Sequence, residues 1–279
     1  MYSFVHMENR QVELLFSENL MIDVDFGINA LNTYLSEIAL LQAGATFADL
    51  GFSERREAQR PLNLNNIAML RLSGVMRLED SLSTLGVRSL ADYIQAADQD
   101  PDIRGILLDV NSGGGEAVAG SYLKDAIESA SKPVVVHGHF VGSAAYLAAL
   151  AADEIILSSE MAKAGSIGAM ITINKEMLQA YKERFIDVYA TQSKDKNKEF
   201  REAMNGDMSF IQKSIDKAAD IFQDTVLQYR KIKDKDKALS GSMFYAKEAK
   251  ALGLVDGIGG IGYAVKRLRS HINYSNELV

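Results

Sequence analysis

Ser143 is the residue of this chain whose neighbours best suit nucleophilic chemistry. It lies in the segment Val141-Gly-Ser-Ala-Ala-Tyr146, between an apolar β-like run and an alanine-rich helical run. A strand-to-helix corner of this kind can expose a serine hydroxyl beside backbone N–H groups. A small serine is also a common first residue of a helix. The segment by itself therefore allows either a nucleophile or a helix cap.

A glycine-rich turn upstream could supply N–H groups for a reacting carbonyl oxygen. Residues 104–110 read as a buried strand, the turn Asn111-Ser-Gly-Gly-Gly115 follows, and residues 117–127 have helical periodicity. Backbone N–H groups in such a turn can receive negative charge, as half of an oxyanion hole does. The lysine and Ser/Thr that close a phosphate-binding loop are missing after these glycines. Phosphate binding is therefore disfavoured.

The surrounding elements predict that this turn and Ser143 lie close together. Residues 132–137 form a second predicted strand ending near Ser143, and residues 153–157 form a third, followed by Ala164-Gly-Ser-Ile-Gly168. Successive strand–turn–helix units place both features at equivalent ends of neighbouring parallel strands, where open α/β sheets build their sites. We therefore expect the two features to form one site.

Four motifs in this order resemble the signal peptide peptidase A family of serine proteases, which includes phage capsid assembly proteases. The resemblance covers Ile67 to Leu268 and rests on residues 111–115, 143–155, 165–168 and 249–256. The chain has Ser143-Ala-Ala-Tyr146 where the family usually has Ser-Gly-Gly-Tyr. It also has Ser112-Gly-Gly-Gly115 where the family usually has Ser-Pro-Gly-Gly. Both replacements are small, so the backbone can still approach a substrate closely.

The resemblance implies a serine–lysine dyad, with the lysine a little over fifty residues after the nucleophile and behind a β-strand. Residues 185–190 are the predicted strand, and Lys196 follows Ser143 by 53 positions (196 − 143). The glycine and histidine of the family pattern are missing here, so Lys194 and Lys198 stay open as alternatives. In the family a second serine hydrogen-bonds the lysine nitrogen, and Ser166 has that place.

A lysine can act as a base only after burial has lowered its pKa from about 10.4. Carboxylates of Asp195 and Glu199 would oppose this if they pointed the same way.

The expected mechanism follows the serine-protease template. Lys196 takes the proton of Ser143, the serine oxygen attacks a peptide carbonyl, and an acyl-enzyme forms before water releases it. The N–H groups of Gly114 and Ala144 are the candidate oxyanion donors. The candidates for lining the substrate groove are Gly113, Gly115 and Tyr146. The expected chemistry needs no cofactor and no metal.

His137 and His139 invite a second interpretation, as a histidine base or as zinc ligands. Alternate residues of a strand face the same side, so the two imidazoles could converge. Zinc needs more ligands, however, and the chain has neither a cysteine nor a His-Glu-x-x-His helix. A histidine base lies outside the family's pattern. We therefore expect both histidines to be strand residues or to line the site, and no metal site.

Composition limits the partners and the compartment. The 279 residues include 30 basic and 37 acidic ones, a net charge of −7, so a nucleic-acid partner is not expected. Cysteine is absent, which excludes disulfides and thiol catalysis. Neither a signal peptide nor an apolar run of about 18 residues is recognisable. We therefore expect no membrane anchor and a cytoplasmic location, in a host cytoplasm or inside an assembling phage prohead.

The predicted organisation is a helical extension and linker over residues 1–66 and a peptidase domain over residues 67–279. The resemblance implies an α/β fold, the Clp protease/crotonase-like spiral of ββα units, which commonly assembles into homo-oligomers. Asp256, in the closing segment, is expected to cap a turn. Residues 209–233 are a predicted long helix.

The leading hypothesis for function is a soluble serine endopeptidase of the phage capsid maturation type, acting on capsid or scaffold proteins. The alternatives are a cytoplasmic peptidase that degrades peptide fragments and a catalytically silent, crotonase-like scaffold.

Overall fold

The computed structural model of the chain describes residues 60–80 and 84–277, together with 20–22, 39–40, 43, 50–51 and 57. The helical extension predicted within residues 1–66 lies mostly outside this described part. The chain divides into two compact units. The larger comprises Met21–Gly168 and Phe222–Val279, and the smaller comprises Met1–Leu20 and Ala169–Ile221. No helix of the described residues is both long enough and apolar enough to cross a membrane.

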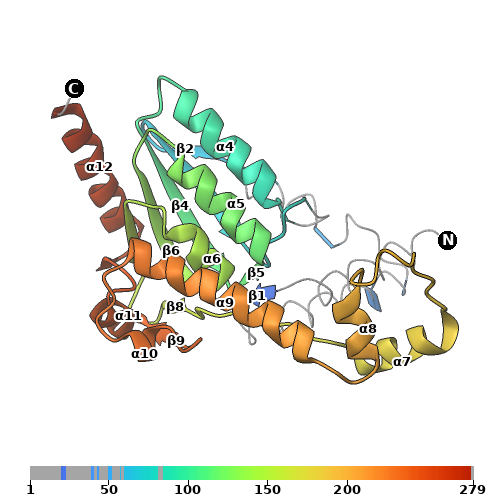
Figure 1. Cartoon of the computed structure of the whole chain (residues 1–279). Helices are drawn as coiled ribbons and strands as arrows, with labels where there is room; N and C mark the ends of the chain where they lie inside the picture. Colours follow the sequence, from blue (N-terminus) through green and yellow to red (C-terminus); the bar gives the residue numbers. More distant parts are fainter. Residues whose placement is uncertain are drawn as a thin grey trace. The chain divides into compact units, whose positions relative to one another are not determined.

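The larger unit is built on a mostly parallel sheet (Figure 1). Its strands in spatial order are β10 (Gly257–Ile258), β7 (Glu154–Leu157), β6 (Val134–Gly142), β4 (Gly105–Ser112), β3 (Ile67–Ser73) and β2 (Leu62–Asn63). Only β2 in this path is antiparallel to its neighbour. The central strands are almost continuously buried, which is why they read in the sequence as unbroken apolar runs. The α/β fold class predicted from the sequence is confirmed.

β6 changes its partner along its length. Its first half pairs with β7, and its last residues pair with β8 (Lys163–Gly165), which in turn is antiparallel to β9 (Met243–Tyr245). Two short strands, β1 (Leu20–Ile22) and β5 (Gly114–Glu116), form a separate pair. β6 therefore links two parts of the sheet and ends immediately before Ser143.

Helices cover the sheet of the larger unit. α4 (Val87–Gln99) and α5 (Ala117–Glu128) pack against each other, and α5 also packs against α6 (Ala144–Ala149) (Figure 1). α12 (Ile261–Glu277) covers the face that carries Met69, Leu107 and Val135. Neighbouring strand residues point to opposite faces, so the buried Ile106 and Leu108 face away from α12. The same unit also contains the short helices α10 (Lys235–Ala238) and α11 (Ala246–Leu252).

Asp256 holds the closing segment to the sheet. Its carboxylate accepts a hydrogen bond from the Ile155 N–H at 2.8 Å and two from the Arg230 guanidinium at 2.9 Å each. Arg230 also donates to the Gly253 carbonyl. A bidentate pair of this kind fixes geometry more than a single contact does. Asp256 therefore ties the closing segment to β7 and to Arg230, rather than capping a turn as the sequence predicts.

The smaller unit contains α7 (Lys175–Arg184), α8 (Lys198–Met204) and the first part of α9 (Ser209–Tyr229). The strand predicted over residues 185–190 is wrong, because this segment has no regular structure. No other strand of the described residues pairs with it, and a strand without a neighbour leaves its backbone groups unpaired. Ile186 and Val188 are each 92% exposed as a result.

Candidate active site

Ser143 lies at a strained corner between β6 and α6. Its backbone angles are φ 52° and ψ −119°, a region that residues other than glycine rarely occupy. The Ser143 N–H donates to the Gly165 carbonyl at 2.9 Å, and the Ser143 carbonyl accepts from the Leu147 N–H at 2.9 Å. Hydrogen bonds on both sides therefore hold this conformation in place.

The Ser143 hydroxyl does not serve as a helix cap. The residue has the N-cap position of α6, yet its side chain makes no capping hydrogen bond. A capping serine would accept from an N–H of the first turn. The helix-cap alternative thus loses its physical basis. A serine on a sharp strand-to-helix turn instead has the backbone geometry of a nucleophile elbow, and Ser143 is 1% exposed in the single chain.

Ser166 lies next to Ser143 at the same edge of the sheet. Gly142 of β6 and Gly165 of β8 are register partners, so each serine directly follows one of two paired residues. Ser166 also has a positive φ, 56°, and its N–H donates to the Ser242 carbonyl at 2.8 Å. The structure therefore brings together the two serines that the sequence singles out.

The glycine turn after β4 lies beside the same edge. Ser112 is the register partner of Val141, and a Cβ on Gly142 would lie 3.3 Å from the Gly113 carbonyl oxygen. A Cβ on Gly115 would lie only 2.1 Å from the carbonyl oxygen of Met76. No side chain fits there without moving the backbone. The glycines thus allow the turn to pack against the end of β6.

The N–H of Gly114 already has a partner within this turn. It donates to Ser112 Oγ at 3.1 Å, and that hydroxyl donates to the Gly74 carbonyl at 2.6 Å. Ala144 is the first residue of α6, where a backbone N–H has no partner inside its own helix. The Gly114 N–H would therefore have to give up its hydrogen bond to Ser112 Oγ before it could donate to an oxyanion, whereas the Ala144 N–H has no partner within α6 to give up.

Tyr146 belongs to the core, and its expected place in the substrate groove is corrected by the structure. Its side chain is fully buried, and its hydroxyl donates to the Leu254 carbonyl at 2.7 Å. Burial raises the pKa of this hydroxyl. The sequence favours a groove position for Tyr146 because it lies three residues after Ser143. In the structure its side chain, like the rest of α6, is buried in the interior.

The three candidate lysines belong to the smaller unit, whereas Ser143 and Ser166 belong to the larger one. The side chains of Lys194 and Lys196 are exposed, and the Lys196 N–H closes a turn onto the Ser193 carbonyl. Lys198 is half-buried, with its Nζ 4.7 Å from the centre of the Phe210 ring. The assignment of the base therefore stays a prediction.

A pocket in the smaller unit was not foreseen from the sequence. It has a volume of about 970 Å³. Its walls are chiefly apolar, and the charged residues Asp195 and Lys198 also line it. Its apolar lining includes Ile171, Ile173, Leu178, Phe200, Phe210 and Ile211. These residues are spread over an irregular segment and three helices, so no periodic signal in the sequence joins them.

Comparison with known proteins identifies the family. A family model described as Peptidase family S49 matches residues 126–275, more than half of the chain. The chain therefore belongs to peptidase family S49, which confirms the resemblance to signal peptide peptidase A. The matched range includes Ser143, Ser166 and all three candidate lysines.

Curated relatives carry names of the same kind. The protein named "Putative protease MJ0651" from Methanocaldococcus jannaschii is 30% identical over 200 residues, which cover 68% of this chain and 63% of that protein. "Protease 4" from Haemophilus influenzae is 27% identical over 222 residues, covering 76% of this chain and 36% of that protein. The chain thus spans less than two thirds of the length of either relative.

Solved structures with a similar arrangement include an enoyl-CoA hydratase/isomerase family member. The two share 16% sequence identity with a TM-score of 0.47, covering 77% of this chain and 75% of that one.

Proposed function

We propose that this chain is a serine endopeptidase in which Ser143 is the nucleophile and Lys196 the general base. The observation that carries the proposal is the Ser143 corner, where a positive φ, firm backbone hydrogen bonds and a hydroxyl unused for capping occur together. Strained backbone of this kind clusters at functional sites because only the surrounding structure maintains it. Membership of a peptidase family supports the same reaction class.

The proposed reaction begins when the neutral amine of Lys196 takes the proton of Ser143 Oγ. The oxygen attacks the carbonyl carbon of a peptide bond, and the carbonyl oxygen becomes an oxyanion. The N–H groups of Ala144 and Gly114 donate to it, each worth about 3 kcal/mol. The C–N bond then breaks, the lysine ammonium protonates the leaving amine, and water hydrolyses the remaining ester.

Ser166 is the proposed partner of the lysine amine. It lies beside Ser143 at the ends of paired strands, which supports a place next to the base. A lysine exposed to water stays charged at neutral pH. Because the side chain of Lys196 is exposed in the single chain, we propose that the base becomes active only when substrate or a neighbouring copy in a homo-oligomer desolvates it.

The test combines covalent labelling with cleavage mapping. A fluorophosphonate probe reacts with an activated serine, and tryptic mass spectrometry locates the adduct. We expect labelling at Ser143 alone, together with cleavage of a carboxymethylated, unfolded protein. Ser143→Ala should abolish both, whereas Ser129→Ala, which changes an exposed serine, should leave both intact. Labelling elsewhere would refute the assignment of the nucleophile.

The natural substrate is a separate prediction. We propose capsid or scaffold proteins of a phage as substrates, which purified candidate proteins would test by defined cleavage at a few positions. Degradation of many short peptides with little effect on folded proteins would favour the cytoplasmic peptidase instead. A wild-type chain that is neither labelled nor active in any assembled form would support the silent scaffold.

A further inference from the structure

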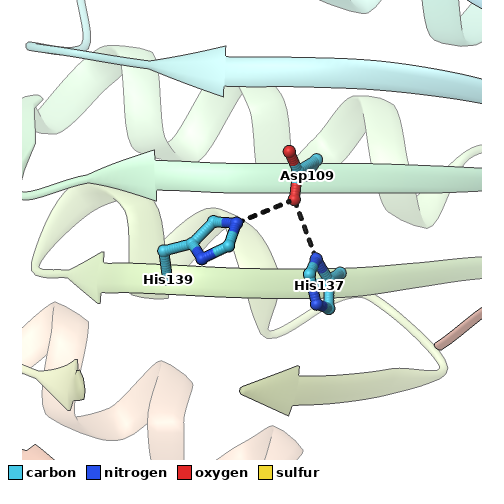
Figure 2. Close-up of side chains that lie close together, drawn as sticks. All are labelled: Asp109, His137 and His139. Carbon is cyan, nitrogen blue, oxygen red and sulfur yellow. Dashed lines mark hydrogen bonds and ion pairs between the residues drawn. The ribbon is translucent and has the colours of Figure 1, made fainter. Parts of the chain in front are cut away.

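Asp109, His137 and His139 form a cluster on two neighbouring strands of the larger unit. Asp109 of β4 and His137 of β6 are register partners, and His139 lies two residues further along β6. Figure 2 shows both imidazoles reaching the same carboxylate. His137 Nδ1 lies 2.8 Å from Asp109 Oδ1, and His139 Nε2 lies 3.6 Å from that oxygen. The fold thus adds a third side chain to the pair of histidines noted in the sequence.

The chemistry of this set suits a transition metal. Two imidazoles and one carboxylate are ligands that first-row divalent metals favour, whereas Mg²⁺ and Ca²⁺ prefer oxygen ligands. One ligand atom from each side chain can be chosen so that all three lie within 4.8 Å of one another. Donors bound to one Zn²⁺ at about 2.1 Å are at most ~4.2 Å apart. Small side-chain rotations would therefore close the set around an ion.

The cluster is buried on one side and open on the other. The side chain of His137 is 3% exposed and that of His139 is 53% exposed, so an ion can enter past His139. Within the described part of the chain, Nε2 of His137 has no hydrogen-bond partner. The buried ring is therefore held through Nδ1. When a metal ion takes Nδ1, the neutral ring carries its proton on Nε2, and no existing hydrogen bond of Nε2 is lost.

The charge around the cluster indicates which ions would bind. Arg71 of β3 is the register partner of Asp109, so a positive side chain emerges from the neighbouring strand. The positive charge of Arg71 repels a divalent cation, so the Asp109 carboxylate alone would bind such a cation only weakly. The two nitrogen donors must then supply most of the affinity, which favours Zn²⁺, Ni²⁺ or Cu²⁺ over Mn²⁺.

We propose that Asp109, His137 and His139 form a binding site for one divalent transition-metal ion such as Zn²⁺. The ligands are Nδ1 of His137, Nε2 of His139 and the Asp109 carboxylate, with water at the open positions. The sequence predicted no metal site, because the two histidines alone are too few ligands. The proposal does not depend on peptidase activity, so the two can fail separately.

The experiment titrates the full-length, chelator-treated chain with ZnCl₂ by calorimetry and with CoCl₂ by visible absorption. We expect one ion per chain, ligand-field bands from bound Co²⁺, and a higher Tm in excess zinc because only the folded chain holds the site. His139→Ala should weaken zinc binding about tenfold or more, and Asp109→Asn should do so as well. MgCl₂ should leave the Tm unchanged.

The matched control is His271→Ala. His271 is the other histidine among the described residues that lies near a carboxylate, 3.3 Å from Glu154 Oε1. We expect this variant to bind zinc as the wild type does. Because His139 is half-exposed, its replacement tests binding without removing core packing.

Three outcomes would overturn the proposal. These are no zinc binding below about 100 µM, equal affinity in His139→Ala and the wild type, or loss of binding in the His271→Ala control.

Discussion

The corner at Ser143 and the segment around Lys196 carry the two halves of one proposed reaction, yet they are built in opposite ways. Ser143 is 1% exposed, and hydrogen bonds to two different elements hold its backbone. Lys196 lies in a series of turns with its side chain in solvent. The proposed nucleophile is therefore preorganised by the sheet, whereas the proposed base lacks the burial that its role requires.

This difference teaches that the two partners depend on different levels of structure. A serine nucleophile needs a fixed backbone corner and nearby N–H groups, which a strand end and a glycine turn provide locally. A lysine needs removal from water, which only tertiary or quaternary contacts provide. Four predictions test this contrast, from the largest expected effect to the smallest.

Replacing the lysines one at a time is the most direct way to break the comparison. We expect Lys196→Ala to lower kcat about 10⁴-fold, as loss of a catalytic partner does. Lys194→Ala and Lys198→Ala should change kcat only a few-fold. Initial rates on one fluorogenic peptide measure all three. A large loss in Lys198→Ala with an active Lys196→Ala would move the base to the half-buried lysine.

Adding a methyl group at Gly115 tests whether the glycine turn is as rigidly packed as the Ser143 corner. The new Cβ would meet the Met76 carbonyl oxygen at 2.1 Å, so Gly115→Ala should lower the free energy of unfolding by about 3 kcal/mol. Gly262→Ala is the control, because a Cβ there meets nothing within 4 Å. Urea denaturation compares the two. Similar free energies of unfolding in both variants would mean that the backbone of the turn moves to accommodate the methyl group at little cost.

Tyr146→Phe distinguishes a core residue from a groove residue next to Ser143. The change removes the hydroxyl that donates to the Leu254 carbonyl, leaving a buried acceptor unpaired. We expect the free energy of unfolding to fall by about 1–2 kcal/mol while KM stays unchanged. Thermal denaturation and steady-state kinetics measure the two quantities. An altered KM with unchanged stability would return Tyr146 to the groove.

Ser143→Gly separates strain from chemistry at the nucleophile. Glycine adopts φ 52° without steric cost, so the variant should lose activity yet gain about 1 kcal/mol in the free energy of unfolding over Ser143→Ala. Ser143→Ala keeps the strain and is therefore the proper reference. Equal stability of the two variants would show that the corner stores no strain.

The sequence predicted the central sheet well because its strands are buried on both faces. The expected strands 104–110, 132–137 and 153–157 correspond to β4, β6 and β7. β6 continues to Gly142, five residues beyond its expected end, because pairing with β8 extends it. The strand over 185–190 failed for the converse reason, since its apolar pattern has no partner strand. Pairing, rather than local composition, decided both outcomes.

In the candidate site, too, some features were predictable from local sequence and others depended on contacts between distant segments. The strand-to-helix segment and the glycine-rich turn predicted Ser143 and residues 113–115 as site candidates, and the family resemblance added Ser166; their catalytic roles stay predictions. Tyr146 could not be assigned correctly, since its burial depends on Leu254, more than a hundred residues away in the chain. The pocket of the smaller unit could not be predicted either, because its lining residues come from segments that are separate in the sequence.

The sequence by itself determined the family, the order of strands and glycine turns, and the serine at the strand-to-helix corner. Local apolar runs and glycine positions fix these features through backbone conformation and burial. The tertiary structure alone decided which distant groups meet: Ser143 with Ser166, Tyr146 with Leu254, and Asp109 with the two histidines of β6. The first and third of these depend on strand register, which arises only when separate segments pair within one sheet. The second depends on the packing of α6 against the segment that follows α11.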